Sequence, residues 1–98
     1  MISIVLEDVN CRIVTRICQI GNEDCLVGNE DLELLSGISE SSYSVFGPDN
    51  MPKLIGELEL LKTEVGHEQQ IKHLDEIIAL ANQCRSEKNL VLSFTPFE

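Results

Sequence analysis

The chain has 98 residues but no tryptophan, and its only aromatic residues are one tyrosine and three phenylalanines. Basic residues are also few, because seven Lys and Arg stand against seventeen Asp and Glu, for a net charge of −10. A small domain with this charge repels nucleic acid and anionic membrane surfaces, so we expect neither as a partner. The partners that the charge favours are cationic, either a basic protein or, less often, a metal ion.

Long apolar runs are absent as well. No stretch approaches the roughly 20 apolar residues that a membrane-spanning helix needs. The start, MISIVLED, has no basic residues before its apolar ones, unlike a secretory signal. We therefore expect a cytoplasmic protein. Hydrophobic residues make up 43% of the chain, which predicts a single domain over residues 1–98 with one modest core.

Most motifs of catalysis are missing. There is no P-loop and no G-x-G-x-x-G, and the segment 37–41, GISES, lacks the second glycine of a nucleophile elbow. Glu64 and His67 have the Glu-x-x-His spacing of di-metal sites, but such sites need two motifs, and Gly66 interrupts this one. We therefore expect no enzyme, no cofactor and no metal site. A Cys–His pair or a carboxylate pair that meets only in space stays open.

The four cysteines, Cys11, Cys18, Cys25 and Cys84, contain no C-x2-C pair. The seven-residue spacing of the first three is therefore a weak metal signal. In a reducing compartment, free cysteine behaves as a small apolar side chain. We expect these cysteines to be buried.

The first half of the chain predicts a β-hairpin. Residues 2–6 alternate between core and surface types, residues 7–10 are rich in turn formers, and residues 11–20 are rich in β-branched side chains. In the second strand, alternation places Arg12 and Arg16 on one face. The other face then receives Ile13, Thr15 and Ile17.

The second half predicts two helices and a last strand. Residues 43–46 read as a short strand, and helical spacing then runs to Val65, where Gly66 suits a left-handed helix end. Gly56 lies inside this helix, so we expect a close approach to another element there. A second helix over residues 67–87 and a strand over 90–94 follow, whereas residues 32–38 fit either a strand or a helical turn. The pattern predicts an α+β fold, with an antiparallel sheet of about four to five strands and a two-helix hairpin packed on one face, in an undetermined strand order.

A doubled motif is the most distinctive feature. Residues 21–24, GNED, return as residues 28–31, which places five carboxylates within eleven residues and no base among them. These candidate partner-binding residues are Glu23, Asp24, Glu30, Asp31 and Glu33. Their spacing does not match an EF-hand calcium loop. Two interpretations stay open: solvated polar turns, or an acidic surface for docking a basic partner.

Three segments carry a resemblance to a known group: VF at 45–46, MPKLIGELELL at 51–61 and LVLSF at 90–94. With its size, charge and layout, the chain resembles immunity proteins of bacterial contact-dependent growth inhibition and polymorphic toxin systems. The resemblance implies a protein that binds a cognate toxin and blocks its active site or an essential surface. Such a toxin is expected to be basic, and a nuclease is one candidate, because carboxylates can occupy its phosphate sites. The alternative is a small acidic secretion chaperone, which would dimerise, or an adaptor without catalysis.

Overall fold

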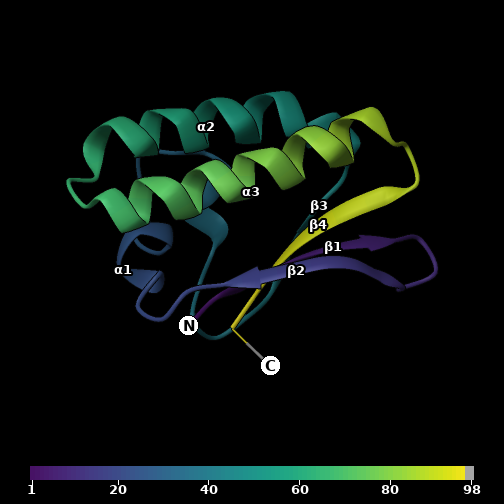
Figure 1. Cartoon of the computed structure of the whole chain (residues 1–98), viewed down its shortest axis with the longest axis horizontal. Helices are drawn as coiled ribbons and strands as arrows, with labels where there is room; N and C mark the ends of the chain where they lie inside the picture. The colour runs from purple at the N-terminus through teal and green to yellow at the C-terminus, as the bar shows by residue number, and fades with distance from the viewer. Residues whose placement is uncertain (97–98) are drawn as a thin grey trace.

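The computed structural model describes residues 1–96 and shows a four-stranded antiparallel sheet with two long helices on one face (Figure 1). This arrangement confirms the predicted α+β class and the helical hairpin. The last two residues of the predicted domain, 97 and 98, lie outside the described residues. Over residues 1–96, no helix is long and apolar enough to cross a membrane.

The secondary structure follows the predicted order. The strands are β1 (Ser3–Asp8), β2 (Ile13–Cys18), β3 (Ser44–Phe46) and β4 (Leu90–Thr95). The helices are the single turn α1 (Glu23–Leu26) and the long α2 (Met51–Glu64) and α3 (Glu68–Ser86). Two 3-10 turns, Leu35–Gly37 and Pro48–Asn50, complete the set.

The strands lie in the order β2-β1-β4-β3. β4 comes last in the chain but inserts between β1 and β3, and it pairs antiparallel with both. The ends of the β1–β4 ladder are the pairs Ser3–Thr95 and Asp8–Leu90. β2 and β3 are therefore the two edges of the sheet.

The core lies between the sheet and the helices α2 and α3. Alternate residues of β1 and β4 point toward the helices, where the apolar stripes of α2 and α3 cover them. Phe46 and Phe94 pack edge to face, with ring centroids 5.8 Å apart. Fully burying one such side chain contributes about 1.5–3 kcal/mol, so this layer is the main source of stability. The sheet and the residue that precedes β1 contribute Ile2, Ile4, Leu6, Leu90, Leu92 and Phe94, and the helices contribute Leu54, Leu58, Leu61, Leu74, Ile77 and Ala81.

The second strand is shorter than the predicted 11–20, and one face assignment is wrong. The pairing of β1 with β2 shifts near the hairpin turn, so Ile13 lies opposite Glu7, on the face away from the helices. Ile13 is consequently 63% exposed. Thr15 and Ile17 keep the predicted face toward the helices. Cys11 lies in the turn before the strand, with a left-handed φ of 63°.

The expectation of buried cysteines is wrong for two of the four. Cys25 and Cys84 are buried, and burial raises the pKa of both thiols. Cys11 and Cys18 are exposed. Cys18 is paired with Ser3, which lies between the core residues Ile2 and Ile4 and therefore points to the opposite face. Cys18 consequently faces away from the helices.

Two expectations about connections also change. Gly66 does not adopt a left-handed conformation; α2 ends because Val65 is extended, and its N–H donates to the Leu61 carbonyl at 3.2 Å. An extended exit from a helix needs no glycine. The sequence of residues 21–31 is typical of a loop broken only by the apolar pair Leu26 and Val27, but this segment contains the turn of helix α1. Of the two forms that the sequence allows for residues 32–38, the structure has the helical turn, as a 3-10 turn.

Candidate functional site

The first copy of the GNED motif is largely structural. Asn22 is 1% exposed, and its amide binds the backbone of Ile2 twice, accepting from N–H at Oδ1 and donating from Nδ2 to the carbonyl, both at 2.7 Å. The same Nδ2 lies 3.1 Å from Nε2 of His73 on α3. Asn22 thus ties the loop before α1 to the residue that precedes β1 and to the long helix.

The acids of this first copy have different roles. The Glu23 carboxylate pairs with the N-terminal amine of Met1 at 2.8 Å. The hydrogen bond from that amine lowers the pKa of Glu23. Asp24, the next residue, is exposed. Only Asp24 of this pair therefore presents its carboxylate to solvent without a salt bridge.

The second copy repeats the backbone turn but not the buried contacts. Gly21 and Gly28 both take left-handed conformations, with φ of 82° and 86°. Asn29 only donates to the Cys25 carbonyl at 2.8 Å, within the same loop. Glu30 and Asp31 are exposed. The repeat therefore reflects two glycine turns, of which the second faces solvent.

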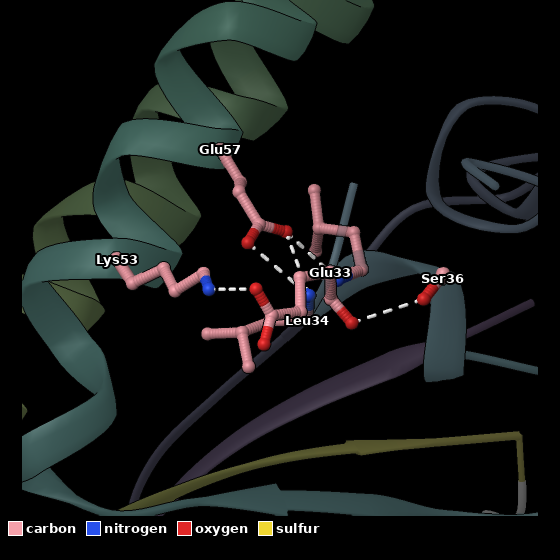
Figure 2. A network of polar contacts seen from close by, with 6 residues as sticks. Glu33, Leu34, Ser36, Lys53 and Glu57 are labelled. Carbon is pink, nitrogen blue, oxygen red and sulfur yellow. Dashed lines mark hydrogen bonds and ion pairs between the residues drawn. The ribbon is translucent and has the colours of Figure 1, made fainter. Parts of the chain in front are cut away.

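Glu33, the fifth predicted residue, already has a partner. Its carboxylate forms a salt bridge with Lys53 of α2, and its backbone carbonyl accepts from Ser36 Oγ at 2.9 Å (Figure 2). A partner protein would have to displace Lys53 to use this carboxylate. Glu33 is therefore a weaker binding candidate than Glu30 or Asp31.

A residue that the sequence did not single out holds this segment in place. The carboxylate of Glu57 is buried and accepts hydrogen bonds from Leu34 N–H at 3.0 and 3.1 Å and from Leu35 N–H at 2.9 Å (Figure 2). These N–H groups begin the 3-10 turn, where a negative charge is favourable. One signal was present: Glu57 lies three residues after Leu54, on the buried stripe of α2.

Glu30 and Asp31 meet α2 at a hollow of about 290 Å³, which we call the acidic hollow. The helix contributes Leu60, which is 49% exposed, and Glu64. Three carboxylates thus line the hollow together with two leucines, Leu32 and Leu60, and none of the lining residues is basic. The lining residues are Gly28, Asn29, Glu30, Asp31, Leu32, Leu60 and Glu64.

Asp24 lies in a different hollow, of about 420 Å³, between the end of the β-hairpin and the first turn of α3. Ile20, which is 92% exposed, and Glu68 also line it. The five predicted residues are therefore divided: Asp24 lies here, Glu30 and Asp31 line the acidic hollow, and Glu23 and Glu33 are engaged in salt bridges.

The exposed carboxylates can act on a partner through their charge. Within the described part of the chain, no three His, Cys, Asp or Glu side chains converge in a way that could hold a metal ion. The buried histidine, His73, contacts the Asn22 amide. Exposed carboxylates around an apolar centre can bind a basic protein surface, because charge steers the approach and the apolar side chain adds contact energy.

The chain matches no protein-family model, and neither a curated protein nor a solved structure is significantly similar to it.

Proposed function

We propose that this protein binds and neutralises a basic protein toxin, as an immunity protein does, and that the acidic hollow forms part of its binding surface. The observation that carries the proposal is that Glu30, Asp31 and Glu64 line the same hollow as the half-exposed Leu60. A charged rim around an apolar centre is the usual anatomy of a protein–protein interface.

The charge of the whole molecule supports the same partner. A protein of net charge −10 attracts a basic domain over a distance and speeds its association. Once the partner has docked, the carboxylates of the acidic hollow pair with its Lys and Arg side chains. If the toxin cleaves nucleic acid, those basic groups are the ones that hold phosphate, so the complex blocks substrate binding.

The hollow is also held in shape before binding. Glu57 anchors the backbone of Leu34 and Leu35 to α2, and the Glu33–Lys53 salt bridge joins the same two elements. A segment that is already ordered loses less conformational entropy when a partner docks. Glu57 acts here as a positioning residue and does not itself reach the surface.

The first test is co-expression with the C-terminal domain of the protein encoded by the adjacent gene, which we expect to be a basic toxin domain. The two should co-purify, and the present chain should restore growth to cells that produce that domain. Cells that die despite abundant expression of this chain, together with no complex between the purified proteins, would contradict the proposal.

The second test places the interface. The triple variant Glu30→Lys, Asp31→Lys, Glu64→Lys should slow association with the toxin domain by about tenfold or more, because opposite charges become like charges. The matched control, Asp49→Lys, Glu76→Lys, Glu87→Lys, changes the net charge equally at exposed positions outside the hollow. Thermal unfolding checks that both variants are folded. Equal slowing in both would assign the effect to net charge and remove the hollow from the interface.

The apolar centre has its own test. Leu60→Ala should raise the dissociation rate by about tenfold, since truncation of a central apolar contact costs on the order of 1–2 kcal/mol. Val45→Ala is the control, because Val45 is exposed to a similar extent, 48%, but lies on β3 at the sheet edge. A Leu60→Ala complex that dissociates no faster than the Val45→Ala complex would exclude Leu60 from the contact.

A further inference from the structure

The two edges of the sheet differ in their readiness to pair with another strand. β3 has only three residues and is followed by Gly47 and Pro48, which prevent its extension. β2 has six residues, and no described strand pairs with its outer side. Its outward N–H and C=O groups are therefore a template for a further strand.

The side chains of this edge are unusually apolar. Of the eight large hydrophobic residues that are exposed in the described chain, three lie on β2 or shortly after it. Edge strands commonly avoid pairing by carrying Lys or Pro, and β2 has neither. Apolar contact would therefore reinforce any backbone pairing here. The three residues are Ile13, Val14 and Ile20.

The charges of the edge indicate which strand fits. Arg12 and Arg16 are the only basic residues in the first 52, and they lie just before and within β2. Beyond the other end of the strand, after Cys18, comes the exposed Asp24. When the β2 strands of two copies run antiparallel, the start of one strand, at Ile13, lies beside the end of the other, at Cys18. Each Arg12 then approaches the segment of the other copy that holds Asp24, and the contact occurs twice.

We propose that two copies of this chain join through β2, antiparallel about a two-fold axis near the middle of the strand, to form one eight-stranded sheet. A two-fold contact between identical surfaces is the commonest form of protein association. Two copies of charge −10 repel each other overall, whereas pairing through β2 brings the basic Arg12 of each copy toward the segment of the other that holds Asp24. The acidic hollow is not used, so this inference stands apart from the proposed function.

The first experiment measures mass in solution by sedimentation equilibrium of the full chain over a wide concentration range. We expect twice the chain mass of 10.9 kDa at high concentration. Arg12→Glu and Asp24→Arg should each weaken dimerisation by about tenfold or more, and the double variant should restore it, because the charges are only exchanged. Arg85→Glu, at an exposed position on α3, is the control and should dimerise normally. A mass that stays monomeric throughout, or a double variant that does not recover, would overturn the proposal.

The second experiment identifies the strand without any substitution. Alternate amides of β2 point away from β1, and in a monomer they exchange rapidly with solvent. Hydrogen exchange should show that these amides become protected as the protein concentration rises across the dimerisation range. A dimer whose outward β2 amides still exchange rapidly would place the interface elsewhere and refute pairing at this edge.

Discussion

At the scale of single residues, Glu57 is the clearest case of a polar side chain that the fold requires. Glu57→Gln removes the charge and places an amide nitrogen near the N–H groups of Leu34 and Leu35. We expect the free energy of unfolding to fall by about 2 kcal/mol, the usual effect of losing hydrogen bonds to a buried charge. Urea unfolding measures this. Glu59→Gln, on the exposed side of the same helix, should change stability by less than about 0.5 kcal/mol. Equal effects of the two variants would mean that the buried carboxylate is not a structural anchor.

His73 gives the molecule a pH-dependent contact. The Asn22 amide uses one hydrogen for the Ile2 carbonyl, so its second hydrogen points to Nε2 of His73, which must accept. His73 is therefore neutral with its proton on Nδ1. Burial lowers the pKa of His73, although nearby Glu76 opposes this effect. A proton on Nε2 would place two hydrogen-bond donors, Nε2–H and the Asn22 N–H, against each other and break the contact.

The direction of the pH effect follows from linkage. Because the folded pKa of His73 lies below the unfolded value of about 6.5, the unfolded chain binds the proton more readily. The stabilisation is complete above that value and is lost as the pH falls below it, at no more than about 1.4 kcal/mol per pH unit. Urea unfolding between pH 7.5 and 5.5 should show this slope, and His73→Gln should flatten it. His67→Gln, at the exposed start of α3, should leave the slope unchanged. An unchanged slope in His73→Gln would assign the effect to other groups.

At the scale of elements, Gly56 is a weak point of α2. No atom outside its own helix lies within 4 Å of where its Cβ would be, so the expected close approach is absent. Gly56→Ala should therefore raise the free energy of unfolding by about 1 kcal/mol, through better helix propensity. A Cβ at Gly28 would also meet no atom within 4 Å, but Gly28 has a left-handed φ of 86°. Gly28→Ala should therefore lower the free energy of unfolding by about 1 kcal/mol. Urea midpoints of the two variants give the comparison, and a destabilising Gly56→Ala would contradict the helix argument.

At the scale of the whole molecule, charge repulsion opposes the compact state. The exposed salt bridges Lys62–Asp75 and Lys53–Glu33 contribute little. Unfolding allows the excess acids to separate, so salt that screens them should raise the free energy of unfolding at pH 7. The Glu30→Lys, Asp31→Lys, Glu64→Lys variant has a net charge of −4, since each change adds two charges to −10, and should respond less. Stability that falls as NaCl is added would show that the ion pairs outweigh the repulsion.

Much of the architecture could be predicted from local patterns. Alternation in residues 2–6 and helical spacing in 51–64 and 68–86 each record which face of one element is apolar. These patterns were enough to predict the hairpin, the two helices, the last strand and the layered arrangement. It was wrong at Ile13 because a shift in pairing with β1 reversed one face, and at Gly66 because Val65 ends the helix in an extended conformation.

The candidate site was only partly predictable. The doubled motif correctly drew attention to Glu30 and Asp31, but the sequence could not show that Glu23 meets the chain terminus or that Glu33 meets Lys53. It gave no sign that Leu60 and Glu64 complete the hollow, because these residues are distant in sequence and meet the loop only when α2 packs.

The sequence by itself determined the charge, the class of fold and the two glycine turns, since composition, periodicity and backbone preference are local properties. Only the tertiary structure decided that β4 lies between β1 and β3, that Asn22 is buried against His73, and that β2 remains an open edge. Those outcomes depend on which elements pack together. The local sequence of a strand or a carboxylate does not identify the element that will lie beside it. The contact energy that selects this neighbour arises only when both elements have come together.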